Sequence, residues 1–141
     1  MRVELSRYRV KQGKSARVDE WLGLLNQRMD EVTEALDREE MKLEVIFREV
    51  IGGGDYLYWF SVQGEEGQPV QTSPFDIDRA HIEFWEECID HDYGRRDAQP
   101  QVIMLPEVVA RSMQWENPSA AAVKFQARQL IFRRGKGWSA E

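Results

Sequence analysis

Residues 56–63 read YLYWFSVQ, a run of mostly aromatic and aliphatic side chains that is typical of a β-strand. Alternate side chains of a strand point to opposite faces of the sheet. Tyr56, Tyr58, Phe60 and Val62 therefore share one face, and Leu57 and Trp59 share the other. Because both faces are apolar, we expect other parts of the protein to cover both of them.

The segments before this strand alternate between strand and helix patterns. Residues 2–10 have a period of two and predict a strand. From Ser15, which suits a helix N-cap, to Leu36 the apolar residues recur every three or four positions and predict one helix. Residues 42–51 return to a period of two, and the glycine-rich residues 52–55 predict a hairpin loop.

The segments after the strand repeat this alternation. Ser73-Pro74 predicts a helix start, with Asp78 as an alternative cap, and the helix runs on through residues 78–90. Residues 101–105 predict a short strand, followed by a turn of helix over 107–113. The order β-α-β-β-α-β is that of a ferredoxin-like α+β domain, an antiparallel sheet with two helices on one face.

The C-terminal residues differ in charge from the rest of the chain. Residues 118–141 carry five basic side chains against Glu141 alone, and helically spaced apolar residues follow Ser119. We predict a domain over residues 1–113 and a basic extension over 114–141. The extension is predicted to form an amphipathic helix packed on the acidic body, or alternatively a free tail. A nucleic-acid-binding arm is disfavoured because the acidic body repels phosphates.

Length and composition exclude several classes of protein. The chain of 141 residues is 42% hydrophobic and 31% charged, as expected for one soluble globular domain. No apolar run is long enough to span a membrane, and the charged start Met1-Arg2-Val3-Glu4 is unlike a secretory leader, so we expect a cytoplasmic protein. The single cysteine, Cys88, excludes an internal disulfide, and the net charge of -6 argues against nucleic acid as a partner.

The predicted sheet leaves one face without helices. If Leu57 and Trp59 lie on that face, they expose an apolar patch larger than a monomer usually tolerates, since a buried aromatic side chain removes about 150–250 Å² from water. A second copy of the chain would cover this patch about a two-fold axis. We therefore predict a homodimer whose two sheets enclose a barrel-like cavity.

The alternation of side chains predicts which residues line this cavity. If Val3, Leu5, Val45, Phe47, Phe60 and Val62 face the helices, the opposite set faces the cavity. Trp59 would stack on a small aromatic or carboxylated ligand and Arg48 would bind its anion, unless Arg48 and Glu44 pair with each other or across the dimer. A one-residue bulge in the first strand would instead direct Arg7 and Arg9 into the cavity in place of Tyr8. The predicted ligand-binding residues are Tyr8, Glu44, Arg48, Trp59, Ser61, Gln63 and Trp85.

His81 is the candidate catalytic residue. It lies near the start of the second helix, where the helix dipole lowers the pKa of the imidazole and keeps it neutral, as a general base requires. The alternative is a structural histidine bonded to a loop carbonyl. His81 and Cys88 are about 10.5 Å apart along a helix, too far to bind one metal ion, and Cys88 with His91 or Asp92 supplies only two ligands. We predict no metal site.

Other cofactor motifs are missing from the sequence. Gly13-Lys14-Ser15 resembles the end of a phosphate-binding loop, but the loop is too short and its first glycine is absent. The sequence contains no nucleophile elbow, zinc-protease helix or dinucleotide fingerprint. We therefore expect no cofactor.

Several strings of the sequence together resemble those of a known family. They are ELSRYRV (4–10), GK (13–14), VDEWL (18–22), IFRE (46–49), YLYW (56–59), SVQGE (61–65), and residues of 77–90 that include His81. The similarity covers roughly residues 1–110 and is to an uncharacterised family of small bacterial proteins, a domain of unknown function. The resemblance implies a dimeric α/β barrel, a superfamily that includes cofactor-free monooxygenases, polyketide cyclases, sugar mutarotases, haem-degrading enzymes and ligand-binding proteins. A shared fold does not choose among these activities.

Two functions remain in agreement with the sequence. The first is a homodimer that binds a small organic ligand between its sheets. The alternative is a cofactor-independent isomerase, cyclase or monooxygenase, with His81 as general base and Tyr8 or Arg48 polarising a carbonyl group.

Overall fold

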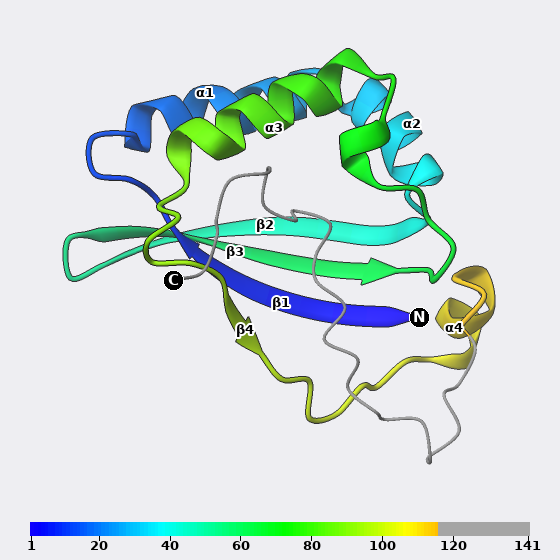
Figure 1. Cartoon of the computed structure of the whole chain (residues 1–141). Helices are drawn as coiled ribbons and strands as arrows, with labels where there is room; N and C mark the ends of the chain where they lie inside the picture. Colours follow the sequence, from blue (N-terminus) through cyan, green and yellow to red (C-terminus); the bar gives the residue numbers. More distant parts are fainter. Residues whose placement is uncertain (116–141) are drawn as a thin grey trace, which may run out of the picture.

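The computed structural model describes residues 1–115, so the predicted basic helix lies outside the described residues. Its strands form one antiparallel sheet in the order β2-β3-β1-β4, and Figure 1 shows α1, α2 and α3 together on one face of that sheet. This arrangement confirms the predicted ferredoxin-like α+β fold. The elements are β1 (Arg2–Arg9), α1 (Ser15–Gln27), α2 (Met29–Arg38), β2 (Met41–Ile51), β3 (Gly54–Gln63), the short 3-10 turn η1 (Val70–Thr72), α3 (Asp76–Cys88), β4 (Arg96–Ala98) and α4 (Glu107–Ser112).

The predicted single helix over residues 15–36 is two helices in the structure. Arg28 leaves the helical conformation with ψ of 35°, and its side chain pairs with Glu31 in the first turn of α2. Leu25 of α1 and Val32 of α2 nevertheless line the same pocket. The apolar pattern continues across the break, which is why the sequence predicts one helix.

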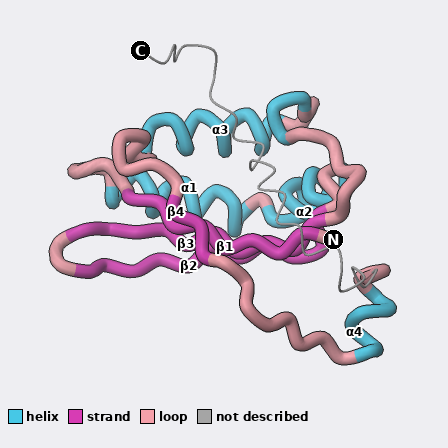
Figure 2. The backbone as a smooth tube through the Cα atoms, turned by 60° about the horizontal axis from the view of Figure 1, so that its bottom comes forward, coloured by secondary structure: helices cyan, strands magenta, loops and turns pink. Residues whose placement is uncertain are grey.

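The fourth strand lies earlier in the chain than predicted. β4 pairs with β1 through Ser6 and Asp97, and the Ser6 hydroxyl donates a hydrogen bond to Asp97 Oδ1 at 2.7 Å. Residues 99–105 run away from the sheet on the side opposite the helices (Figure 2), and Met104 is 86% exposed. The predicted strand over 101–105 is therefore wrong, because this apolar run does not pair with the sheet. The predicted turn of helix that follows it is confirmed as α4.

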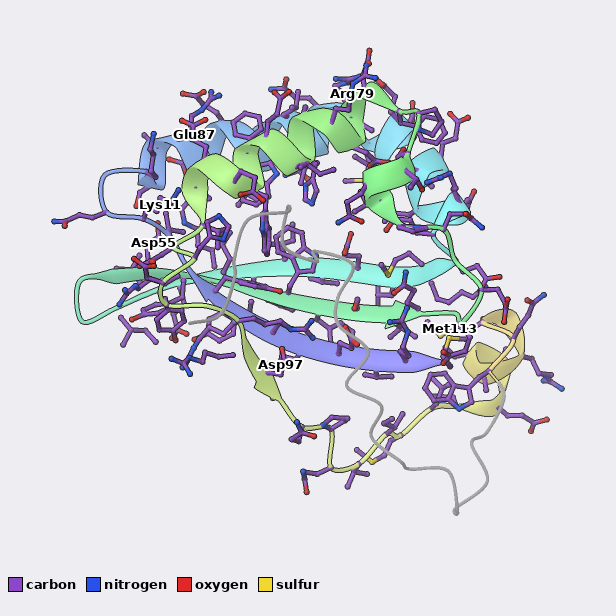
Figure 3. All side chains as sticks on the ribbon, in the orientation of Figure 1. Lys11, Asp55, Arg79, Glu87, Asp97 and Met113 are labelled. Carbon is purple, nitrogen blue, oxygen red and sulfur yellow. The ribbon has the colours of Figure 1, made fainter. Side chains whose placement is uncertain are left out.

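Asp55 joins the β2–β3 hairpin to the start of α1 (Figure 3). Its carboxylate accepts hydrogen bonds from Arg48 Nε at 2.9 Å and Nη2 at 2.6 Å, and from the Ser15 hydroxyl at 2.6 Å. Ser15 is therefore not the N-cap that the sequence predicts. Lys14 occupies that position, and no side chain caps it. The Arg48 guanidinium group therefore serves to hold the hairpin against α1.

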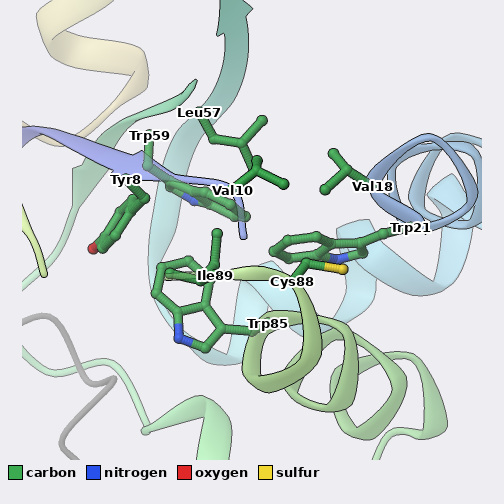
Figure 4. Close-up of a cluster of buried hydrophobic side chains, with 9 residues drawn as sticks. All are labelled: Tyr8, Val10, Val18, Trp21, Leu57, Trp59, Trp85, Cys88 and Ile89. Atoms are coloured by element: carbon green, nitrogen blue, oxygen red, sulfur yellow. The ribbon is translucent and has the colours of Figure 1, made fainter. Parts of the chain in front are cut away.

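The sheet face that carries Trp59 packs against the helices, whereas the sequence predicts that this face points away from them. Trp59 points toward the helices, where its ring lies 5.8 Å from Trp21 and 5.5 Å from Trp85, and Leu57 beside it is fully buried (Figure 4). Because both faces of β3 are apolar, alternation alone does not reveal which one meets the helices. The side chains predicted for a cavity between two sheets therefore lie inside the subunit. The buried core consists of Tyr8, Val10, Val18, Trp21, Leu57, Trp59, Trp85, Cys88 and Ile89.

The other face of the sheet is left largely uncovered, because α1, α2 and α3 all lie on the opposite side and, among the described helices, only the short α4 lies on this side, near one end of the sheet (Figures 1 and 2). The strand register places Phe47, Tyr58 and Phe60 on this uncovered face. Phe47 is 56% exposed and Leu43 is 42% exposed. The structure thus retains an open apolar face, although not the one that the sequence suggested.

Candidate functional site

A pocket lies between the sheet and the helices, at the end where α2 meets β2. Its volume is about 70 Å³. Several of its side chains are only partly buried, so the pocket reaches the surface. The apolar walls are formed by Leu25, Val32, Leu36, Met41, Ile46, Val70 and Ile77, and the polar or aromatic lining by Glu39, Glu44, Trp59, Gln63, Asp78 and His81.

Glu44 and Trp59 reach the pocket from neighbouring strands. Glu44 lies opposite Ser61 in the register of β2 and β3, so its side chain is on the helix-facing side with that of Trp59. The Trp59 indole Nε1–H donates a hydrogen bond to Glu44 Oε1 at 2.7 Å. Burial raises the pKa of Glu44 although this hydrogen bond opposes the shift.

Glu39 is positioned by the loop that follows β3. The Gly64 N–H donates to the carbonyl of Glu40 at 2.9 Å and the Gln68 N–H to that of Arg38 at 3.1 Å, so the loop is fastened to the end of α2. A Cβ on Gly67 would lie 1.9 Å from the Glu39 carbonyl oxygen, so this close approach requires glycine.

Gln63 also holds this end of α2. Its side-chain Nε2–H donates to the Glu39 carbonyl at 3.0 Å, and its Oε1 accepts from Arg2 at 2.8 Å. The Gln63 amide therefore connects β3 to the residue that carries the Glu39 carboxyl group. Burial, followed by the charges of Glu44 and Asp78, raises the pKa of Glu39 to about 8, with Arg38 opposing.

The raised pKa of Glu39 predicts that the fold weakens as the pH rises. The folded state holds the Glu39 proton up to about pH 8, whereas the unfolded chain releases it near its ordinary pKa, so stability is lost between these values. We expect Glu39→Gln to raise the free energy of unfolding at pH 8 by about 2 kcal/mol, a value reduced for partial exposure of the side chain. Urea titrations at pH 5 and pH 8 measure this change. An equal effect at both values would contradict it.

Asp78 lies in the first turn of α3, inside the helix and not at the alternative cap position that the sequence suggests. Only 8% of the residue is exposed, and its Oδ2 atom is buried with no hydrogen-bond partner among the described residues. Burial raises the pKa of this carboxyl group, while Ser73 and Arg38 oppose the shift. Asp78, which lines the pocket, therefore carries a buried carboxylate oxygen with unused hydrogen-bonding capacity.

His81 occupies the second turn of α3. The Trp21 indole Nε1–H donates a hydrogen bond to His81 Nδ1 at 3.0 Å, so a neutral His81 ring carries its hydrogen on Nε2. Burial lowers the pKa of His81 to about 4. Burial causes this lowered pKa, and not the helix dipole that the sequence suggests, because the dipole acts mainly within the first turn. This tautomer favours His81 as a hydrogen-bond donor over the predicted role of general base.

The structure brings together four of the eight residues predicted for the site. Glu44, Trp59, Gln63 and His81 line the pocket, whereas Tyr8, Arg48, Ser61 and Trp85 do not. Tyr8 packs edge-on against Trp85 in the core, and burial raises its pKa to about 12. Arg48 pairs with Asp55 and Asp19, so the alternative pairing with Glu44 does not form within the subunit.

Two pocket carboxyl groups, those of Glu39 and Asp78, were not predicted as site residues. Glu39 directly follows α2 and Asp78 belongs to another helix. Neither residue belongs to a short motif, so their proximity follows from the packing of α2 and α3. The clustering of acidic residues at the end of the predicted helix at 15–36 was the available signal, but it is also typical of a solvated surface.

The residues considered as metal ligands do not form a metal site. Within residues 1–115, no three His, Cys, Asp or Glu side chains are placed to hold a metal ion. Cys88 is fully buried in the core, and His91 lies 3.2 Å from Glu86 at the end of α3. Within the same part of the chain, no helix has the length and apolar character needed to cross a membrane.

Comparison with known proteins identifies the family. The model of a family of unknown function, DUF6176, matches residues 1–111. The chain belongs to DUF6176. Membership in DUF6176 agrees with the resemblance found in the sequence. No curated protein matches the DUF6176 chain significantly. Among solved structures, the crystal structure of L-rhamnose mutarotase FA22100 from Formosa agariphila is similar to it, with a TM-score of 0.46 and 13% identity over 76% of this chain and 100% of that chain.

Proposed function

We propose that this DUF6176 protein binds a small organic molecule in the pocket between its sheet and its helices. The observation that supports this proposal is the unpartnered, buried Asp78 Oδ2 at a pocket that also receives Glu44 and His81. Ligand sites typically combine apolar walls with a few polar groups that fix orientation. A ligand that donates a hydrogen bond to Asp78 removes the penalty of a buried, unsatisfied oxygen.

The binding site lies within one subunit under this proposal. Glu44, Trp59 and Gln63 were expected to face a cavity between two sheets, but their side chains face the helices. The site therefore does not require a second copy of the chain, and ligand binding and self-association are separate properties.

Filling the pocket tests ligand binding. Leu36 is a partly buried wall residue of α2, so we expect the indole of Leu36→Trp to occupy the pocket of about 70 Å³ and to exclude a ligand. Native mass spectrometry after incubation with a metabolite extract should show a bound small molecule on the wild type and a loss of about tenfold or more on the variant.

The matched control for this experiment is Thr33→Trp, an exposed position on the same helix. It should retain the ligand. A wild-type protein that retains no molecule, or a Leu36→Trp variant that binds as well as Thr33→Trp, would contradict the proposal.

A second candidate is a cofactor-independent enzyme of the isomerase, cyclase or monooxygenase type. The specific observation is that burial raises the pKa of Glu39 and Glu44 beside a neutral His81. A carboxyl group with a raised pKa is a better proton acceptor than an ordinary carboxylate, and Glu39, whose pKa is raised to about 8, exchanges protons near neutral pH. In such an enzyme a pocket carboxylate, and not His81, acts as the general base.

The two candidates differ in whether the bound molecule changes. The molecule recovered from the binding experiment would be incubated with the wild type and with Glu44→Gln, whose amide still accepts the Trp59 hydrogen bond. Catalysis predicts a new product with the wild type alone and ligand retention by the variant. An unchanged molecule leaves ligand binding as the function. Glu34→Gln, at an exposed position of α2, is the control.

We also propose that the protein is a homodimer formed through the uncovered face of the sheet. Exposed Phe47 and Leu43 lie on this face with Tyr58 and Phe60, and a second copy about a two-fold axis covers such a patch with its own equivalent. Light scattering at low micromolar concentration should give twice the chain mass of 16.5 kDa.

A variant pair tests which face forms the dimer. Phe47→Lys should give the monomer mass, because it places a charge in the apolar interface. Val50→Lys is the control, because Val50 is 69% exposed and alternates onto the other face of the sheet. A wild type with the mass of one chain would contradict the dimer, and a Phe47→Lys dimer would contradict this interface.

A further inference from the structure

We propose that the pocket takes an organic cation, a primary ammonium group on a short aliphatic chain, and this inference rests on the proposed ligand-binding function. The pocket receives carboxyl groups from three elements. Glu39 comes from the end of α2, Glu44 from β2 and Asp78 from α3. An ammonium group complements such a carboxyl-lined pocket, since it carries a positive charge and hydrogen-bond donors.

No described cation neutralises these carboxyl groups directly. None of the ion pairs within residues 1–115 includes Glu39, Glu44 or Asp78. The nearby Arg38 donates its hydrogen bonds to the carbonyls of Pro69 at 3.1 Å and Thr72 at 3.0 Å. These three carboxyl groups therefore form no ion pair within the described part of the chain, and Arg38 acts on Glu39 and Asp78 only at longer range.

The buried oxygen of Asp78 is an independent indication of a ligand. Asp78 is 8% exposed, and its Oδ2 has no described hydrogen-bond partner. A buried acceptor without a donor is uncommon in folded proteins and destabilises the fold unless a bound group satisfies it. The partner of an ionised Oδ2 is a donor, which an ammonium N–H supplies and a carboxylate ligand does not.

The geometry favours an organic cation over a metal ion. No three acidic, histidine or cysteine side chains within residues 1–115 are close enough together to hold one metal ion. The pocket walls are aliphatic, with Leu36, Val70 and Ile77 among them. A volume of about 70 Å³ corresponds to roughly two water molecules at about 30 Å³ each. It admits a compact ammonium head with a few carbon atoms, and a longer chain would extend through the opening.

The ionisation of the pocket agrees with this assignment. Burial raises the pKa of Glu39, Glu44 and Asp78, which means that the empty pocket disfavours their negative charges. The other charged or titratable groups at the site are Arg38, which opposes the shifts at Glu39 and Asp78, and His81, which is neutral. A bound cation favours the ionised carboxylates, so its binding should release protons and strengthen as the pH rises.

The test compares n-butylammonium with 1-butanol, which has a similar shape but no charge, by calorimetric titration of the full chain. At pH 8.5, butylammonium should bind at least about tenfold more tightly than butanol. Its affinity should fall at pH 6, where the carboxyl groups hold more protons. Asp78→Asn and Glu39→Gln should each weaken butylammonium binding by about tenfold. Asp76→Asn is the matched control, because Asp76 is an exposed acidic residue in the same turn of α3.

Three results would overturn the inference. The first is that butanol binds as tightly as butylammonium. The second is that butylammonium does not bind at about 50 mM. The third is that both carboxyl variants bind butylammonium as tightly as the wild type, when circular dichroism shows that the variants are folded. The first result leaves the proposed function intact with a neutral ligand. Failure of the proposed function itself appears separately, as the absence of any bound molecule in the mass-spectrometry experiment.

Discussion

Replacing Trp21 with alanine is expected to lower the free energy of unfolding by about 3–5 kcal/mol, much of the stability of a domain of this size. Trp21 is fully buried at the centre of the aromatic core. Its ring lies 5.8 Å from Trp59 and 6.2 Å from both Phe84 and Trp85. Because the surrounding rings come from both the sheet and α3, neither layer collapses easily into the cavity left by the missing indole.

Urea denaturation followed by circular dichroism measures this loss. Trp21→Phe is the matched variant, since it keeps an aromatic ring but removes the Nε1–H that donates to His81 Nδ1. We expect it to destabilise the fold by about 1–2 kcal/mol, through a lost hydrogen bond and a smaller cavity. Equal losses in the two variants would show that the hydrogen bond, and not the packing, dominates at this position.

Replacing Asp55 with alanine is expected to destabilise the protein by about 3 kcal/mol. The Asp55 side chain is about 10% exposed and accepts hydrogen bonds from Arg48 and Ser15. Its removal leaves the partly buried Arg48 guanidinium group and the Ser15 hydroxyl group without this acceptor. The hairpin then loses the polar contact that Asp55 makes with α1. The arginine lowers the pKa of Asp55, so the stabilisation is present above the ordinary aspartate pKa and is lost only as the pH falls below it.

Asp19→Ala is the matched control for this prediction. Asp19 binds the same guanidinium group, but its side chain is 69% exposed. Exposed ion pairs stabilise proteins by about 0–1 kcal/mol, so we expect a loss in that range. Denaturant titrations at pH 7 compare the two variants. Equal losses at both positions would contradict the view that Asp55 is the structural partner of Arg48.

The sequence predicts the fold well because the fold depends on local periodicity. The two-residue period of residues 42–51 and 56–63 and the helical period that begins at Ser15 correspond to the observed β2, β3 and α1. The last strand was misplaced, because the apolar residues 101–105 resemble a strand while β4 is the polar Arg96–Ala98. Pairing with β1, which no local pattern encodes, selects the polar segment.

The candidate site is less predictable because it depends on which face of the sheet meets the helices. Alternation correctly groups Glu44, Trp59 and Gln63, but it does not distinguish the inside of the subunit from an interface. Once Trp59 packs on Trp21, Arg48 on the same face is drawn to Asp55 at the hairpin and away from the pocket. Glu39 and Asp78 approach each other only after α2 and α3 have packed, so their shared site follows from tertiary structure.

The break at Arg28 separates a helix that packs in the core, α1, from a helix that lines the pocket, α2. α1 holds Val18 and Trp21 in the aromatic core, whereas α2 supplies Leu36 and ends beside Glu39 at the pocket. Substitutions in α2 therefore change the shape and charge of the pocket while the core contacts of α1 remain. Under the proposed ligand-binding function, substitutions among the ten residues of α2, apart from the buried Ala35, are expected to alter which molecules the protein accepts more than they alter its stability.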